Sequence, residues 1–136
     1  MSSSSFEEIG KLILRLAVGV LMLFHGLAKI SNGVSGIESM VAAHGLPAFF
    51  AWAVYIGEVL APVLLILGLY ARAGALLVVV NMIVAILLVH MPQLTQLGNS
   101  GGWKLELQGL FLFGALAIAF LGAGSHSLGG KGGRWN

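Results

Sequence analysis

The chain has 136 residues, of which 58% are hydrophobic and only 9% are charged. Because soluble domains carry about a quarter charged residues, this composition indicates an integral membrane protein and excludes an ordinary soluble domain. The net charge is only +2 and the basic residues flank apolar segments, which excludes a nucleic-acid-binding surface. The absence of cysteine excludes disulfides and thiolate-bound iron–sulfur clusters, so any redox role needs a bound cofactor or a partner.

A first membrane span is predicted at residues 9–30, after a polar lead, residues 1–8, that we expect to be frayed and cytoplasmic. At about 100° per residue, five residues of this span fall on one stripe, which begins and ends with a basic residue and contains two glycines: Arg15, Gly19, Met22, Gly26 and Lys29. The two glycines would let another helix approach closely, so we expect the stripe to face the interior of a bundle. His25 flanks the same stripe.

Residues 31–46 form a loop that is expected to contain a short interfacial helix at about residues 36–44. Ser35 and Glu38 are spaced as a capping box, which predicts that Ser35 caps this helix. Gly45 is expected to end it in a left-handed conformation. The apolar residues of the helix are expected to dip into lipid: Ile37, Met40 and Val41.

The second span is predicted at residues 47–70 and carries one ionisable side chain, Glu58, near its middle. A carboxylate at that depth is costly unless it is neutral or meets a partner inside the bundle, so Glu58 is the first candidate for a catalytic or ligand-binding group. A buried polar contact that only holds helices together is the alternative. Pro62 removes a backbone donor one turn later and is expected to kink the helix beside a small polar pocket.

Two further spans are predicted at residues 73–91 and 104–121. Asn81 lies near the middle of the third span and His90 near its end. Glu106 lies in the first turn of the fourth span, where a carboxylate suits the helix dipole. We expect the glycine-rich loop between these spans, and the tail that follows the fourth, to be the mobile parts of the chain.

The sequence therefore predicts a single all-α domain over residues 1–136, a four-transmembrane-helix bundle in a bacterial-type cytoplasmic (inner) membrane. Basic residues near the span ends decide its orientation. Five would lie at the end that carries both termini, and two at the other end: Lys11, Arg15, Arg72, Lys131 and Arg134 against Lys29 and Lys104. The positive-inside rule then predicts that both termini are cytoplasmic.

Three stretches resemble the DoxX family of small four-helix membrane proteins: RLAVGVLMLFHGLAKI at residues 15–30, GEVLAPVLLILGLYAR at 57–72, and ELQGLFLFGALAIAFLGAGSHSL from residue 106. Their order and spacing, over nearly the whole chain, carry the resemblance. It implies four membrane helices and an association with membrane redox systems. The family's namesake is tied to a thiosulfate:quinone oxidoreductase, and relatives accompany soluble oxidoreductases or oxidative-stress enzymes. The resemblance implies no established set of catalytic residues.

Arg15 and Glu58 form the leading interior pair. A rise of about 1.5 Å per residue puts them at depths that differ by ~6 Å, which an arginine side chain can bridge. The alternative is that Arg15 extends to the cytoplasmic headgroups.

A second group of polar residues is expected near the outer leaflet: His25, Lys29, His90 and Glu106. Lys29 and Glu106 match in depth and are expected to pair, whereas His25 lies about one turn deeper. A quinone headgroup could then lie between His25 and Glu58, with its carbonyl oxygens bonded to His25 and Lys29. The alternative is that these side chains only solvate the helix ends.

The positions of the histidines disfavour haem and metal sites. Asn81 and His90 are secondary candidates for ligand binding, but they lie about 180° apart on one helix, so His90 is expected to face away from the core if Asn81 faces it. A bis-histidine haem between His25 and His90 is therefore not expected. No closely spaced ligand pair such as H-x-x-x-H is present, so no metal site is expected either.

The first functional hypothesis is a membrane subunit of a redox system that binds a quinone or docks a soluble oxidoreductase or another redox subunit. The second is a small transporter that uses Arg15 and Glu58, and the third is a membrane assembly factor without a ligand. The sequence leaves open whether the protein is an enzyme and whether it forms a homo-oligomer.

Overall fold

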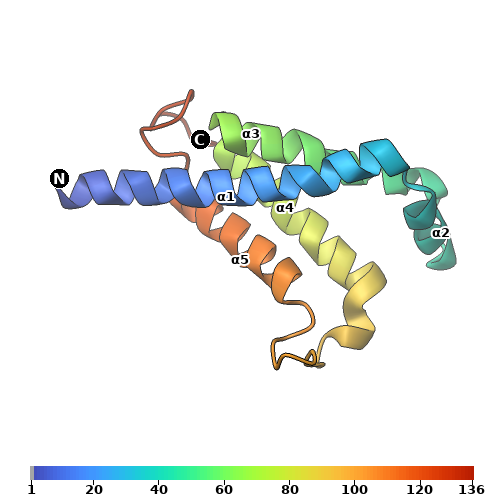
Figure 1. Ribbon diagram of the computed structural model, residues 1–136. Coiled ribbons are helices and arrows are strands. Elements are labelled where there is room, and N and C mark those ends of the chain that lie inside the picture. Colours follow the sequence, from blue (N-terminus) through green and yellow to red (C-terminus); the bar gives the residue numbers. More distant parts are fainter. Residues whose placement is uncertain (1) are drawn as a thin grey trace.

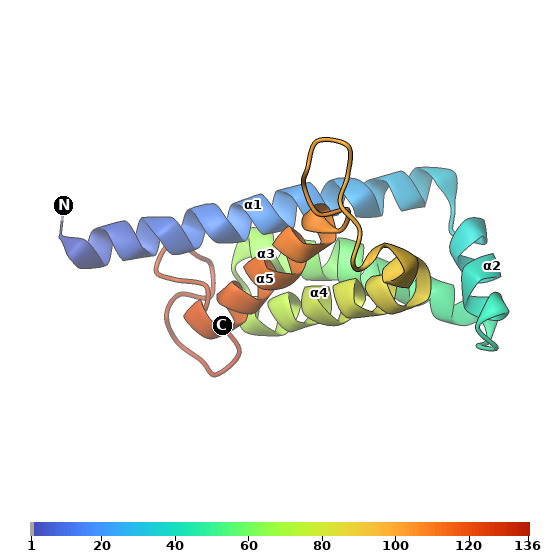
Figure 2. The same cartoon turned by 90° about the horizontal axis from the view of Figure 1, so that it is seen from below.

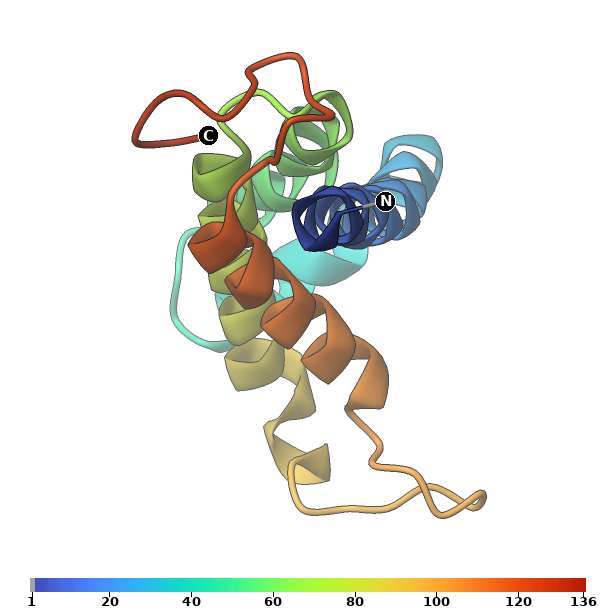
Figure 3. The ribbon, with the colours of Figure 1, turned by 90° about the vertical axis from the view of Figure 1, so that its left-hand side faces the viewer.

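The structure, a computed structural model, describes residues 2–136, and this part of the chain consists of helices and loops with one isolated β-bridge between Leu97 and Trp103. Its helices form four rods, and Figure 1 shows α1 and α3 side by side with α4 and α5 inclined to them. Viewed from the end of the molecule that carries both termini, the two pairs pack against each other (Figure 3).

The first rod is α1 (Ser3–Asn32), and α2 (Ser35–Ala43) joins it to the second rod. The second rod consists of three consecutive helical segments: η1 (Ala48–Ala53), η2 (Ile56–Leu60) and α3 (Ala61–Leu67). The third rod consists of α4 (Ala71–Ala85), η3 (Ile86–His90) and η4 (Met91–Gln93), and the fourth is α5 (Glu106–Leu121). η1 and η4 are 3-10 turns, whereas η2 and η3 are π turns.

The first three rods are long and apolar enough to cross a membrane: Ser3–Asn32, Ala48–Leu67 and Ala71–Gln93. α5 is also apolar but has 16 residues. Its length is therefore about 24 Å, compared with about 30 Å for the hydrocarbon core of a bilayer. The protein is an all-α, multi-pass membrane protein, while a fourth crossing and the orientation stay predictions.

The predicted stripe of α1 faces the interior, as expected. Four of its members are buried: Arg15, Gly19, Met22 and Gly26. A Cβ on Gly19 would lie 3.2 Å from the main-chain oxygen of Pro62, and a Cβ on Gly26 would collide with the main-chain oxygen of Glu58. The two glycines therefore allow α1 to lie directly against the backbone of the second rod.

Arg15 is bound by main-chain carbonyls at the end of α3. The residue is 1% exposed, and its Nη1 donates hydrogen bonds to the carbonyls of Leu65 and Ile66, the latter at 2.9 Å. Its Nη2 donates to the carbonyl of His126 at 2.6 Å. The last carbonyls of a helix lack partners within the helix and carry partial negative charge, so a guanidinium there satisfies and neutralises them.

The predicted contact between Arg15 and Glu58 is therefore wrong, and Arg15 does not reach out to headgroups either. Glu58 lies beside Gly26, which is eleven residues, or ~16 Å, farther along α1 than Arg15. The depth estimate assumed that the second rod pairs with α1 from its first residue. Its first turn, η1, packs on α2 instead, which shifts the register between the two rods.

Arg72 repeats this arrangement in the second pair of helices. Its Nη1 donates to the carbonyls of Ala119 and Phe120 at the end of α5, at 2.7 and 2.9 Å. Its Nε donates to the main-chain oxygen of Asn136 at 3.0 Å, and its backbone N–H to the carbonyl of Trp135. The tail, expected to be mobile, is thus folded back onto the bundle by both arginines.

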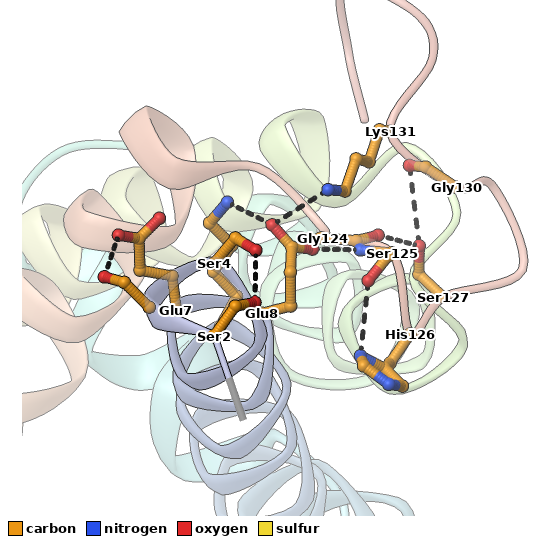
Figure 4. A network of polar contacts seen from close by, with 12 residues as sticks. Ser2, Ser4, Glu7, Glu8, Gly124, Ser125, His126, Ser127, Gly130 and Lys131 are labelled. Atoms are coloured by element: carbon orange, nitrogen blue, oxygen red, sulfur yellow. Dashed lines mark hydrogen bonds and ion pairs between the residues drawn. The ribbon is translucent and has the colours of Figure 1, made fainter.

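The polar lead and the tail also hold each other in place. Glu8 is 7% exposed, and its carboxylate binds Lys11 at 2.8 Å, Lys131 at 3.4 Å and the backbone N–H of Ser125 (Figure 4). The expectation of a frayed lead is wrong for residues 3–8, because these contacts tie the first turns of α1 to the tail. Met1 lies outside the described residues.

The predicted short helix between the first two spans is present as α2, but its predicted cap is wrong. Ser35 lies inside the helix, Val34 precedes it, and no side chain caps it. The carboxylate of Glu38 instead accepts a hydrogen bond from Trp52 Nε1 at 3.0 Å. Gly45 has a φ of +76°, as expected for a left-handed stop.

Part of the apolar side of α2 packs on protein. Val41 is 3% exposed and forms a small core with Val34 and Ala51. Ile37 packs against the same cluster. The expectation that this side dips into lipid is wrong for Val41, because η1 covers it.

The second loop, which was expected to be mobile, is organised by hydrogen bonds and projects from the bundle (Figure 2). Trp103 Nε1 donates to the carbonyl of Leu94 at 2.8 Å, and Gly98 N–H donates to that of Gly102 at 2.7 Å. The backbone N–H of Lys104 bonds back to Gln96. These bonds fold the loop into a narrow hairpin-like shape.

The contact at Gly26 predicts an asymmetric effect of alanine at two glycines of α1. Gly26→Ala should lower the thermal stability of the purified protein strongly, because its Cβ meets the backbone of Glu58. Gly10→Ala is the control, since a Cβ there meets nothing within 4 Å. The control should be neutral or gain up to about 1 kcal/mol from the better helix propensity of alanine. Equal effects of the two substitutions would contradict this packing.

The carbonyl cluster around Arg15 predicts that Arg15→Met destabilises the bundle. The loss should be on the order of 3 kcal/mol, because three carbonyls lose a charged donor. Arg134→Met is the control, since Arg134 is exposed and lies over the ring of Trp135. Denaturant titration in detergent measures both variants. An Arg15→Met protein as stable as the control would show that the carbonyls do not depend on this side chain.

Candidate functional site

A cavity of about 680 Å³ lies at the end of the molecule that carries α2, among α1, α2, the second rod, the third rod and α5. Most of its wall is apolar. Six polar side chains interrupt that wall: His25, Lys29, Glu58, Asn81, His90 and Gln108. Small-molecule sites are usually mainly apolar cavities of roughly 300–1,000 Å³ with a few polar groups, and this cavity has that form.

Glu58 is the centre of one polar cluster in the cavity. The residue is 6% exposed, and its carboxylate forms an ion pair with Lys29 and accepts a hydrogen bond from Asn81 Nδ2 at 3.2 Å. The side chain of Lys29 keeps 26% of its surface exposed. A buried carboxylate is tolerated when a cation and a hydrogen-bond donor satisfy it, which explains its place in an apolar helix.

The backbone of the second and third rods brings this cluster together. Glu58 lies in the π turn η2, directly before the proline-containing first turn of α3. A Cβ on Gly57 would lie 2.5 Å from the side chain of Asn81, so only glycine lets α4 approach this closely. The disturbance expected before Pro62 thus takes the form of a wide turn, a feature that is frequent at functional sites.

Tyr55 orients the end of α1 that carries Lys29. Its hydroxyl donates a hydrogen bond to the main-chain carbonyl of Lys29 at 3.0 Å. This carbonyl lies near the end of α1 and also accepts the backbone N–H of Gly33 at 2.8 Å, so Tyr55 uses its second lone pair. The bond therefore joins the second rod to α1 directly beside the Lys29–Glu58 pair.

His90 and Gln108 form a second polar cluster on the cavity wall. Gln108 Nε2 lies 3.3 Å from His90 Nε2, and His90 Nδ1 lies 3.1 Å from Gln93 Oε1. The geometry fits a neutral imidazole that donates from Nδ1 to Gln93 and accepts at Nε2 from Gln108. Gln108 retains a carbonyl oxygen and a second amide N–H for a ligand.

The expectation that His90 faces away from the core is wrong. Asn81 and His90 both line the cavity. The 180° separation assumed a regular α-helix, but residues 86–90 form the π turn η3. A π turn holds one more residue than an α turn, so it rotates the residues that follow it, and the angular argument against a haem no longer applies.

The other predicted site residues divide between the cavity and the surface. His25 lines the cavity, and its ring meets Phe111 edge-to-face with centroids 5.6 Å apart. Glu106 is exposed and lies in the first turn of α5, as predicted, but it is not part of the cavity wall. The predicted pair between Lys29 and Glu106 is wrong, because Glu58 takes the ammonium group of Lys29.

Gln108 and Tyr55 were missed from the sequence. A lone amide inside an apolar span was a usable signal for Gln108, since such a group needs a partner. No sequence signal distinguishes Tyr55, because a tyrosine near a span end is also the usual membrane anchor.

Metal-binding side chains do not gather within residues 2–136. In that part of the chain no group of three or more His, Cys, Asp or Glu residues is arranged so that it could hold a metal ion. The cavity instead offers neutral and paired polar groups that suit an organic ligand.

Comparison with known proteins gives a family for this chain. The DoxX family model matches residues 10–91, which include Lys29, Glu58, Asn81 and His90. A protein of Bacillus subtilis (strain 168) described as "Putative oxidoreductase CatD" is 31% identical over 116 residues, which cover 85% of this chain and 81% of that protein. No solved structure matches the chain. The family match extends over more than half of the sequence, and the resemblance seen in its motifs is thereby confirmed: the chain belongs to the DoxX family.

Proposed function

We propose that this protein is a membrane component of a redox system and that its cavity binds the headgroup of a quinone. The observation that carries the proposal is one apolar cavity with two separate polar clusters, Lys29–Glu58–Asn81 and His90–Gln108. The name of the Bacillus subtilis relative supports a redox role. Electrons would come from a soluble oxidoreductase or another membrane subunit.

Lys29 is the principal donor to the ligand. An ammonium group has three N–H donors, and Glu58 takes one of them. The partly exposed Lys29 side chain lies on the cavity wall, so its remaining donors can reach a carbonyl oxygen there. His25, on the same helix, lines the cavity as a further donor or proton-exchanging group.

The charge balance of the site favours a neutral ligand over an anion. Glu58 offsets the positive charge of Lys29, and the remaining polar groups of the wall are amides and imidazoles. An anionic substrate would have to approach the Glu58 carboxylate without an unpaired cation to hold it. A quinone is neutral, flat and apolar, with two hydrogen-bond acceptors, and fits these groups.

The transporter hypothesis loses its proposed pathway. It required Arg15 and Glu58 to act together, but Arg15 is bound by carbonyls at the other end of α3. The charged residues that remain at the cavity, Lys29 and Glu58, are paired with each other.

In the proposed topology, the chain crosses a bacterial-type inner membrane four times and both termini lie in the cytoplasm. Five basic residues belong to the lead, the tail or the helix ends next to them: Lys11, Arg15, Arg72, Lys131 and Arg134. The bonds of Arg15 and Arg72 to the tail, and the ion pairs of Lys11 and Lys131 with Glu8, support this grouping. The positive-inside rule gives its direction. The cavity then lies toward the outer leaflet.

Quinone binding can be measured with the purified protein in lipid nanodiscs titrated with decylubiquinone and with menadione. We expect saturable binding, weakened about 10- to 100-fold by the double substitution Lys29→Met with Glu58→Gln, which removes the charged donor without stranding its partner. Gln108→Leu should weaken binding less, because it removes a neutral donor.

Lys104→Met is the matched control for these variants, since Lys104 bonds to Gln96 in the projecting loop. It should bind both quinones as the native protein does. Absence of saturable binding, or equal affinity in the native protein and the double variant, would contradict the proposed function. Mass spectrometry of lipids extracted from the purified protein gives an independent test.

The topology is tested by single cysteines in this cysteine-free chain. A membrane-impermeant maleimide should label Ser39→Cys and Asn99→Cys in intact cells, but Ser3→Cys and Gly132→Cys only after permeabilisation. All four positions are exposed. Labelling of both Asn99→Cys and Gly132→Cys in intact cells would show that α5 does not cross the membrane.

A further inference from the structure

One part of the exposed rim of the cavity lies on η2 and α4. Seven large apolar residues of the wall expose much of their surface, and three of them lie on η2 and α4: Ile56 at 47%, Val80 at 57% and Val84 at 45%. The other four lie elsewhere on the rim: Leu46, Phe50, Val89 and Leu107. Val80 and Val84 are one turn apart on the α4 face that also carries Asn81. A side chain that is part of the wall and also exposed marks an edge where the cavity meets its surroundings.

This edge lies at the depth of the bilayer interior. Val80 and Val84 are about 14 and 20 Å from the start of the 23-residue apolar helix Ala71–Gln93. Ile56 lies within the apolar helix Ala48–Leu67. The medium outside the opening is therefore lipid hydrocarbon rather than water, which agrees with its apolar rim.

We infer that the opening between Ile56, Val80 and Val84 is a lateral portal, through which the ligand enters from the bilayer and in which its apolar chain remains. The inference rests on the proposed function and specifies its substrate class: a quinone whose long isoprenoid chain extends into the membrane. Neither the family nor the relative's name gives a route or a chain requirement.

The volume of the cavity supports a ligand that is only partly enclosed. About 680 Å³ accommodates a ring headgroup and the beginning of a chain, within the usual range of small-molecule sites. Several isoprene units exceed that space, so the rest of the chain needs an exit. The rim at Val80 and Val84 lies beside Asn81, so the exit begins next to the polar cluster that holds the headgroup.

Val80→Trp tests the portal by filling it. The variant should bind a long-chain ubiquinone about tenfold more weakly, because the chain loses its exit, and should bind ubiquinone-0, which has no chain, within about twofold of the native protein. The matched control is Val20→Trp, since Val20 is 39% exposed on α1 and is not part of the cavity wall. It should change neither affinity. Equal losses for both quinones, or no loss for either, would overturn the portal.

A second measurement tests, without any quinone, whether lipid chains reach the cavity through the portal. A bimane label on Ala85→Cys, inside the cavity, should be quenched by phospholipids brominated in mid-chain, and Val80→Trp should reduce that quenching. The same label on Ile83→Cys, which is 44% exposed outside the cavity, should be quenched in both backgrounds.

The two experiments separate the portal from the proposed function. An unquenched label at Ala85, or quenching that Val80→Trp leaves unchanged, overturns the portal even if quinones bind. Quenching that behaves as expected, together with no quinone binding, overturns the proposed function and identifies a phospholipid acyl chain as the occupant of the portal.

Discussion

The direct contact between Gly26 and the backbone of Glu58 sets the register on which the site depends. With no side chain at Gly26, α1 lies against the main-chain oxygen of Glu58, and Lys29 then comes within reach of the Glu58 carboxylate one turn farther along. Gly57 does the same for the third rod, since it lets Asn81 approach from the other side. Three rods thus meet at a single carboxylate because two glycines remove the atoms that would keep them apart.

At the opposite end of the bundle, the same interaction between an arginine and helix-end carbonyls occurs in both pairs of helices. In each pair of helices, an arginine on the first member binds the last carbonyls of the second: Arg15 those of α3, and Arg72 those of α5. Both guanidiniums also bind the tail. Within a membrane, carbonyls at a helix end have little water to bond to, so an internal cation at each end is a strong constraint. The pair α4 and α5 therefore has the same arginine–carbonyl contact as the pair α1 and α3.

These two ends have different consequences for function. At the tail end the carboxylate of Glu8 is held by two lysines and a backbone N–H, and the Nη atoms of Arg15 bond to main-chain carbonyls. At the cavity end the polar groups keep spare hydrogen-bonding capacity: Lys29 has donors left after Glu58, and Gln108 has an amide N–H and an oxygen left after His90. A ligand can bond to such unused donors and acceptors in an apolar cavity, so the cavity end is where a ligand is expected.

The sequence by itself determined the class of molecule and the approximate position of each helix. Apolar runs and their length are local properties, so three spans, the inward stripe of α1 and the isolation of Glu58 could be read directly. The DoxX resemblance was likewise a local property of three motifs. The partners of the charged residues were not, because they depend on the relative height of two helices, and that height depends on how η1 and α2 pack between them.

Only the tertiary structure decided that Lys29, rather than Arg15, neutralises Glu58, and that His90 reaches the cavity. The first outcome follows from the register shift, which no spacing within a single helix reveals. The second follows from the π turn at residues 86–90, which rotates His90 from the position that a regular helix gives it. The register shift depends on contacts between segments far apart in the chain, and the π turn is a local departure from a regular helix. Hydrophobic periodicity carries no information about either.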